Sequence, residues 1–145
     1  ITRFCNIYGG GDLNFQSLIP DIITTILKKQ QPIIRSDGKA VREYIYIEDV
    51  IDAYLILAQS KEKGVFNIGS EEIFSALNLV YQIIAQMKRL NIKPKILNEA
   101  KNEIQNQSLD SSKFYETFNW KPKYNLKTGL KETIRWYREN INHRK

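Results

Sequence analysis

The sequence has very few of the side chains that most often bind metals or carry covalent chemistry. Its 145 residues include one cysteine, Cys5, and one histidine, His143. A single cysteine forms no internal disulfide, and one thiol with one imidazole is too few for a metal-ligand cluster or for Cys/His catalysis. We therefore predict a cytoplasmic protein without a disulfide framework and without a bound metal.

Long apolar runs are also missing. No stretch approaches the roughly 20 apolar residues that a membrane-spanning helix requires. With 42% hydrophobic and 26% charged residues, the composition is that of a globular domain, and 145 residues are enough for one. No repeat or linker divides the chain, and Ile1 stands where a complete chain would have methionine, so we expect a piece of a longer protein.

Basic residues exceed acidic ones, 22 to 16, which gives a formal charge of +6. This excess favours an anionic partner, either a nucleic acid or a phosphate-bearing metabolite. The basic residues are scattered, and only residues 135–145 are locally dense. A solvated helix face explains that stretch better than a nucleic-acid patch, so we predict neither nucleic-acid nor membrane binding.

The hydrophobic pattern alternates between strand and helix along the chain. Runs rich in β-branched and aromatic residues predict strands at 1–8, 33–34, 41–47, 65–70 and 95–97. Apolar residues at helical spacing predict helices at 18–29, from 48 to about 58, at 75–90, from about 109, and from 126 to about 142. Asp37-Gly38 predicts a hairpin turn, and 98–107 reads as a polar loop. The alternation indicates an α/β fold.

Three consecutive glycines, Gly9 to Gly11, follow the first predicted strand. A phosphate-binding P-loop would end in Lys-Ser/Thr at a helix start, and a dinucleotide loop would read GxGxxG; neither pattern is complete here. We interpret the glycines as a sharp exit of the chain from the strand.

Arg42 is the cation with the most specific placement. Strand alternation puts Arg42 on one face with Tyr44 and Tyr46, opposite Glu43 and Ile45. An arginine fork on a rigid strand suits bidentate binding of a phosphate, but an exposed strand arginine often serves only solubility. The residue spacing alone does not decide between phosphate binding and solubility.

Two acidic groups at predicted helix starts could suggest acid/base chemistry. Glu48-Asp49 and Asp110 with Ser111 and Ser112 are each better explained as caps or dipole partners of a helix. The residues by themselves therefore provide no complete catalytic set.

The order of several motifs carries a resemblance to a known family. RFCNIYGGGD, SLIPDII, PIIRSDGKAVREYIYIEDVIDAY, VFNIGS, LDSSK and NWKPKYNLKTGLKETIRWY occur in this order over nearly the whole chain. Together they resemble the C-terminal half of extended short-chain dehydrogenase/reductases, the NAD-dependent nucleotide-sugar epimerases and dehydratases. GGGD, IIR and NEIQNQSLDSSK look most like the CDP-glucose 4,6-dehydratase branch, although GDP-mannose and dTDP-glucose dehydratases and UDP-sugar 4-epimerases share much of the frame.

The resemblance implies a division of labour. Residues 1–145 would be the substrate-binding lobe with the late strands of an extended Rossmann-type sheet. The N-terminal half, with its Gly-rich loop for NAD or NADP and its YxxxK pair, would be absent, since no tyrosine here is followed by lysine four residues later. In such dehydratases hydride leaves sugar C4, water is lost across C5 and C6, and hydride returns to C6. We expect this piece alone to be inactive and the full-length protein to be a homodimeric lyase of polysaccharide biosynthesis that acts on a nucleotide-diphosphate sugar.

The resemblance also carries residue roles onto matching positions, none of them catalytic. Asn6 and Arg42 would meet the diphosphate, and Asn67 would lie near a second phosphate contact. Leu18, Ile19 and Pro20, with Ile33, Ile34 and Arg35, would line the base pocket, and Glu103 and Gln107 would lie in the loop that closes over the nucleotide. Phe4 and Cys5 would line the nicotinamide side. Two other functions stay open, a UDP-sugar 4-epimerase and a non-catalytic module that binds a nucleotide sugar.

Overall fold

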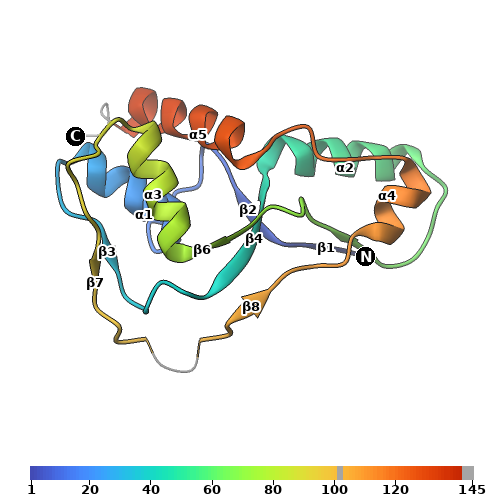
Figure 1. Cartoon of the computed structure of the whole chain (residues 1–145). Helices are drawn as coiled ribbons and strands as arrows, with labels where there is room; N and C mark the ends of the chain where they lie inside the picture. Colours follow the sequence, from blue (N-terminus) through green and yellow to red (C-terminus); the bar gives the residue numbers. More distant parts are fainter. Residues whose placement is uncertain (101–102, 142–145) are drawn as a thin grey trace.

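A computed structural model describes residues 1–100 and 103–141. His143 and the end of the basic stretch therefore lie outside the described residues. The strands are β1 (Thr2–Phe4), β2 (Asn6–Tyr8), β3 (Ile33–Ile34), β4 (Val41–Tyr46), β5 (Phe66–Ile68), β6 (Ile73–Ser75), β7 (Lys95–Ile96) and β8 (Asn106–Gln107). The helices are α1 (Leu18–Leu27), α2 (Ile47–Gln59), α3 (Ala76–Gln86), α4 (Ser112–Phe118) and α5 (Leu126–Ile141) (Figure 1).

Strand β4 is the centre of the strand pairing. It pairs in parallel with β2 and β8 and antiparallel with β6. Two further parallel pairs, β1 with β5 and β3 with β7, lie on either side of it (Figure 1). Strands and helices alternate and most pairs are parallel, which confirms the predicted α/β class.

The side chains of β4 point alternately into two separate cores. Tyr44 and Tyr46 are buried in the first core, together with residues of α1, α3 and α5. Ile45 is buried in the second core, together with residues of α2, α4 and β5. Figure 1 shows α1, α3 and α5 gathered at one end of the molecule and α2 and α4 at the other, with β4 between them. The alternation predicted for this strand is confirmed.

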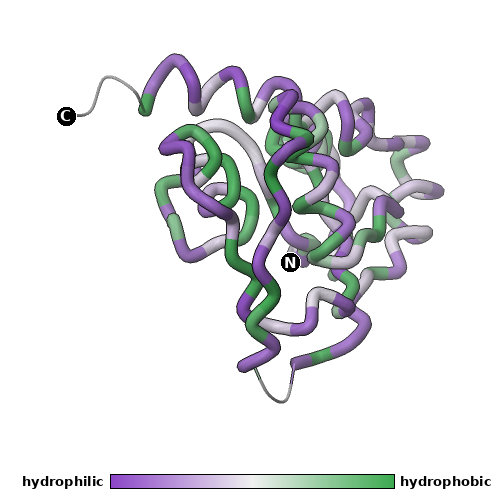
Figure 2. Tube along the Cα trace, turned by 60° about the vertical axis from the view of Figure 1, so that its left-hand side comes forward, coloured by the Kyte–Doolittle hydropathy of each residue, from purple (hydrophilic) through white to green (hydrophobic). Residues whose placement is uncertain are grey.

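Helix α1 buries the face that its apolar spacing predicted, whereas α2 buries Val50 and Ala53 but leaves Tyr54 of its predicted face exposed. In α1, Ile19, Ile22, Ile23 and Ile26 recur at steps of three and four residues and are all buried. Figure 2 shows hydrophobic and hydrophilic residues alternating along the chain, so burial comes from faces and not from long apolar segments. Within the part of the chain that the structure describes, no helix has the length and apolar character needed to cross a membrane.

The prediction of a single strand at residues 1–8 is wrong. The structure divides residues 1–8 into β1 and β2, separated by a bend at Cys5. The two halves join different partners, because β1 pairs with β5 whereas β2 pairs with β4. A local pattern of β-forming residues contains no information about a change of partner.

The predicted hairpin at Asp37-Gly38 is also wrong. Gly38 does adopt a positive φ of 77°, as the turn prediction required. The flanking strands nevertheless do not pair with each other, since β3 pairs with β7 and β4 pairs with β2, β6 and β8. The short strands β6 and β8 were missed because each is held by pairing with β4 and has little strand character of its own.

The acidic residues at the helix starts hold other segments in place. Asp49 is buried, and its carboxylate accepts hydrogen bonds from the backbone N–H groups of Lys123 (2.8 Å) and Tyr124 (3.2 Å). It therefore attaches the connector before α5 to the start of α2, and this helix begins at Ile47, before the predicted Glu48. Asp110 accepts from the backbone N–H of Ser112 (3.0 Å) at the start of α4, consistent with a capping role.

Glu43, the acidic residue of β4, is buried, with 1% of its surface exposed. Its Oε1 accepts from the backbone N–H groups of Ser70 (2.7 Å) and Glu71 (2.9 Å), and its Oε2 accepts from that of Leu109 (2.7 Å). A Cβ on Gly69 would lie 2.0 Å from Oε1, so only glycine allows this approach. One side chain thus joins β4 to two segments that follow it at distances of 27 and 66 residues.

We predict that Glu43→Gln lowers the free energy of unfolding by about 2–4 kcal/mol. Glutamine keeps one acceptor oxygen but turns an N–H group toward another buried N–H group, which leaves a donor unsatisfied. Urea unfolding followed by circular dichroism measures the change, and Glu62→Gln at an exposed position is the control. Equal stability of the two variants would contradict the role given to Glu43.

Several phenols and the thiol are held in their neutral forms. Burial raises the pKa of Tyr44 and of Tyr137 to about 12, and it raises the pKa of the Cys5 thiol, which also lies near the Glu43 carboxylate, to about 12. Burial likewise raises the pKa values of Tyr8 and Tyr115.

We predict that the chain loses stability as the pH rises from about 9 to 12. In this range the unfolded chain ionises first and binds fewer protons than the folded chain, so the free energy of unfolding falls with pH. Urea unfolding at stepped pH values measures the slope, and Tyr44→Phe should make it shallower. A free energy of unfolding that stays constant up to pH 11 would contradict this prediction.

Candidate functional site

A hollow of about 350 Å³ opens where α1, β3 and β4 meet. We call it the arginine pocket. Its lining is Phe15, Gln16, Leu18, Asp21, Ile33, Ile34, Arg35, Ser36, Ala40, Arg42, Tyr44, Ala76, Ala100 and Glu103. The sequence-predicted residues Leu18, Ile33, Ile34, Arg35, Arg42 and Glu103 all lie in it, although they come from four separate parts of the chain.

Arg42 is held at the wall of this pocket by two acceptors. Its Nη1 donates to the backbone oxygen of Val41 (2.9 Å), and its Nη2 forms an ion pair with Glu103 (3.4 Å). The arginine side chain is 19% exposed and the glutamate 31%, so both can be reached from solvent. A ligand phosphate could take the place of the Glu103 carboxylate, because both are anionic acceptors for the same guanidinium fork.

A second hollow of about 240 Å³ lies next to the first. We call it the asparagine pocket. Its lining is Asn6, Ile7, Tyr8, Gly9, Asp12, Ser17, Leu18, Ile19, Pro20 and Tyr44. It contains the predicted Asn6, Leu18, Ile19 and Pro20, and it shares Leu18 and Tyr44 with the arginine pocket.

The start of α1 forms the boundary between the two pockets. Ser17 is the N-cap of this helix, and its side chain makes no capping hydrogen bond. The first N–H groups of a helix have no partner within the helix and favour an anion in front of them. Leu18 and Ile19 have such N–H groups, whereas Pro20 has none. Arg42 lies in the arginine pocket, which shares Leu18 with the asparagine pocket. Helix-terminal N–H groups and a guanidinium are both suited to binding a phosphate.

Four predicted residues lie outside both pockets. Asn67, in β5, donates to the backbone oxygen of Asp110 (3.2 Å), and Gln107 is exposed in β8 opposite Arg42. Phe4 and Cys5 pack against the second core. Within residues 1–100 and 103–141, no group of three His, Cys, Asp or Glu residues is placed to hold a metal ion.

Sequence reasoning missed several residues that line the pockets. Tyr44 could have been found, since strand alternation places it on the same face as Arg42. Asp12, Phe15 and Gln16 follow the glycine loop in a stretch without periodicity, so no local signal indicated which of them would face a pocket. Phe15 is 47% exposed although it is aromatic, which is consistent with a ligand-contacting position.

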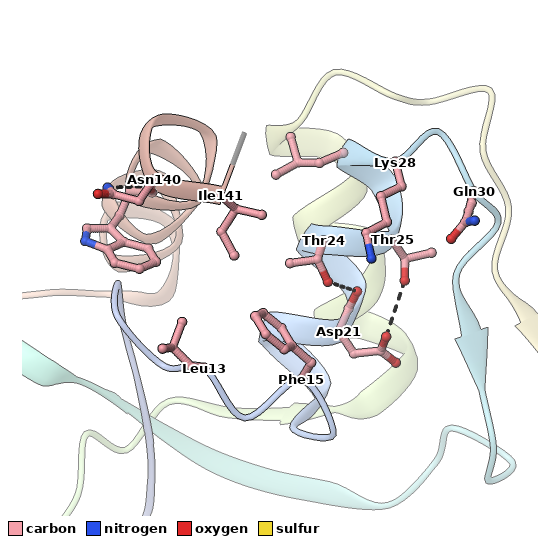
Figure 3. Close-up of a pocket in the computed structure, with 11 residues that line it drawn as sticks. Leu13, Phe15, Asp21, Thr24, Thr25, Lys28, Gln30, Asn140 and Ile141 are labelled. Carbon is pink, nitrogen blue, oxygen red and sulfur yellow. Dashed lines mark hydrogen bonds between the residues drawn. The ribbon is translucent and has the colours of Figure 1, made fainter. Parts of the chain in front are cut away.

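A larger groove of about 740 Å³ lies between α1 and α5 (Figure 3). Phe15 and Asp21 belong to both this groove and the arginine pocket. None of the sequence-predicted site residues lines the groove, and Figure 3 shows Asp21 bonded to Thr25. Among the described residues of its lining, Lys28 is the only one with a cationic side chain, so the size of the groove alone does not make it the better anion site.

Comparison with known proteins supports the resemblance seen in the sequence. Residues 1–69 match the model of the NAD dependent epimerase/dehydratase family. A UDP-N-acetyl-alpha-D-glucosaminuronate decarboxylase from Bacillus cytotoxicus is 32% identical over 148 residues, covering 96% of this chain and 46% of the relative. The dTDP-D-glucose 4,6-dehydratase of Homo sapiens is 29% identical over 150 residues, covering 99% of this chain and 42% of the relative. The chain thus spans less than half the length of these relatives.

Solved structures share the fold. A UDP-glucose 4-epimerase from Thermotoga maritima, solved with UDP-glucose, superposes with a TM-score of 0.89 at 26% identity, covering 97% of this chain and 46% of the other. A dTDP-glucose 4,6-dehydratase from Bacillus anthracis, solved in complex with NAD, gives 0.85 at 26% identity, with 97% and 44% covered. Residues 1–69 thus belong to the NAD-dependent epimerase/dehydratase family, and the remaining residues continue the alignment and the Rossmann-type fold of its members.

Proposed function

We propose that this chain is the nucleotide-sugar binding portion of an NAD-dependent sugar-nucleotide 4,6-dehydratase. The observation that supports it best is the arginine pocket, which brings residues from α1, β3, β4 and the segment before β8 to one place. Arg35 and Arg42 supply positive charge there, while Leu18, Ile33 and Ile34 supply apolar walls. A nucleoside diphosphate needs both, because the phosphates are anionic and the base is flat and largely apolar.

The diphosphate would lie at the boundary of the two pockets. Arg42 would hold it from one side, and Asn6 and the first turn of α1 from the other. Glu103 would leave the guanidinium when the phosphate arrives and would then lie over the nucleotide. The base would lie between Leu18 and the β3 segment that contains Ile34 and Arg35.

NAD, or NADP, is the proposed cofactor, bound mainly by a preceding half of the protein. Phe4 and Cys5 are the residues of this chain that would lie against the nicotinamide, and the cofactor would supply the hydride acceptor. Both side chains are uncharged. Phe4 has no titratable group, and burial raises the pKa of the Cys5 thiol to about 12. An apolar, neutral surface is compatible with a nicotinamide ring, and neither residue is placed to transfer a proton.

The nucleotide base and the function each have more than two candidates. The motif resemblance favours a CDP-glucose or GDP-mannose dehydratase, whereas the relatives and structures named above carry dTDP or UDP in their names. A 4-epimerase is the second candidate function, since a UDP-glucose 4-epimerase shares the fold with a TM-score of 0.89. A binding module without turnover is the third. The full-length protein would be a cytoplasmic homodimer, with Asn67 and Gln107 near the bound nucleotide.

We predict that Arg42→Ala weakens binding of the preferred nucleoside diphosphate by about 1.5–3 kcal/mol, because one charge-assisted contact is lost. Isothermal titration of CDP, GDP, dTDP and UDP against the full-length protein measures this change. Arg89→Ala, which removes the same charge at an exposed position, is the matched control. If Arg42→Ala and Arg89→Ala bind the nucleotide equally well, Arg42 is not part of the site.

Product analysis separates the candidate reactions. With NAD and the preferred nucleotide sugar, we expect the full-length protein to form a 4-keto-6-deoxy sugar that NMR detects. Formation of the C4 epimer instead would establish the second candidate. Tight binding without either product would favour the non-catalytic module.

A further inference from the structure

The glycine loop is held in place by α5, which lies more than a hundred residues later in the chain. The hydroxyl group of Tyr137, a fully buried residue, donates to the backbone oxygen of Asp12. Trp136 lies against Gly10 so closely that a Cβ there would come within 2.5 Å of the indole. Two neighbouring side chains of one helix therefore fix both the path of the loop and its end at Asp12.

This loop needs such external support. Three glycines in a row have more backbone freedom than any other tripeptide, and Gly11 adopts a φ of 92°. Within the loop, Asp12 accepts one local hydrogen bond, from the backbone N–H of Asn14 (2.9 Å). The contacts with α5 convert a flexible segment into one wall of the asparagine pocket, to which Gly9 and Asp12 belong.

The two pockets differ in the kind of polar group that they present. The arginine pocket contains two cations, Arg35 and Arg42, which suit phosphates. Its two carboxylates already have partners, since Glu103 pairs with Arg42 and Asp21 accepts a hydrogen bond from Thr25. Among the residues that the structure describes, no lysine or arginine lines the asparagine pocket, which instead presents the carboxylate of Asp12, with Asn6, Tyr8 and Ser17. A carboxylate repels phosphate but accepts hydrogen bonds from hydroxyl groups, so this lining suits the sugar end of the ligand.

We propose that Asp12 accepts hydrogen bonds from the sugar hydroxyls, and that Tyr137 is a positioning residue that holds Asp12 for this contact. The inference rests on the proposed function, since it requires a nucleotide sugar that spans both pockets. It gives α5 a part in substrate selection, although α5 contributes no residue to either pocket. In the alternative interpretation, the carboxylate of Asp12 makes only the hydrogen bond to Asn14 and stabilises the turn.

The test compares a nucleotide sugar with its free nucleoside diphosphate. Isothermal titration of the full-length protein gives the ratio of the two dissociation constants. The ligands are the pair that binds best among UDP and UDP-glucose, dTDP and dTDP-glucose, CDP and CDP-glucose, and GDP and GDP-mannose. The variants are Asp12→Asn, which keeps an acceptor for Asn14, Tyr137→Phe, which removes only the hydroxyl, and the double variant. Lys131→Ala on the exposed face of α5 is the control, and thermal melting checks that each variant is folded.

We expect Asp12→Asn and Tyr137→Phe each to weaken binding of the nucleotide sugar roughly five- to tenfold and to leave binding of the nucleoside diphosphate unchanged. The double variant should bind no more weakly than Asp12→Asn, because Tyr137 acts through Asp12. If Tyr137→Phe does not fold, Asp12→Asn alone decides the sugar contact, and an unchanged ratio overturns the inference.

Two other results separate this inference from the proposed function. Normal binding of the nucleoside diphosphate with an unchanged ratio in every variant would overturn the inference alone. Failure of the unmodified protein to bind any nucleoside diphosphate would overturn the proposed function and the inference with it.

Discussion

The buried carboxylate of Glu43 is the interaction on which the rest of this structure depends. A carboxylate that is taken out of water must be given hydrogen-bond donors, or the strand that carries it would not be buried. The donors here are backbone N–H groups at Ser70, Glu71 and Leu109. The turn before β6 and the segment before α4 are therefore placed by one side chain of β4, and Gly69 leaves the space for it.

The same strand organises both candidate binding pockets. Because side chains alternate along β4, fixing Glu43 on one face fixes Arg42 and Tyr44 on the other, where both line the arginine pocket. The backbone oxygen of Glu43 also accepts a hydrogen bond from the side chain of Asn6 (2.9 Å), so the residue that gives the second pocket its name is attached to the same point. The central strand thus links the fold to the site through a few hydrogen bonds.

Two of the basic residues lie in the same candidate pocket. The formal charge is +6, and Arg35 and Arg42 lie together in the arginine pocket, which has apolar walls. The ion pair of Arg42 with Glu103 keeps the guanidinium in place before any ligand arrives. The glycine loop is preorganised in the same sense by α5, although its contacts are a hydrogen bond to Asp12 and the packing of Trp136.

Some of the fold and of the site could be predicted from local pattern. The helix of Ile19, Ile22 and Ile26 was visible because amphipathic spacing is a property of neighbouring residues. The placement of Arg42 on the face of Tyr44 was visible for the same reason. The resemblance of the ordered motifs indicated a set of candidate site residues, and six of them lie together in the arginine pocket. Asn67, Gln107, Phe4 and Cys5 lie elsewhere in this chain, and their roles stay predictions.

The sequence by itself determined the α/β alternation, the buried face of α1, the side of β4 on which Arg42 lies and the family motifs, since each follows from residues close together in the chain. The tertiary structure alone decided that residues 1–8 divide between two partner strands, that Glu43 and Asp49 hold distant backbone segments, and that α5 supports the glycine loop. Each of these depends on a hydrogen bond or a pairing between residues far apart in the chain. A local sequence pattern indicates that a buried polar group or a strand needs a pairing partner, and only the tertiary structure determines which distant residue pairs with it.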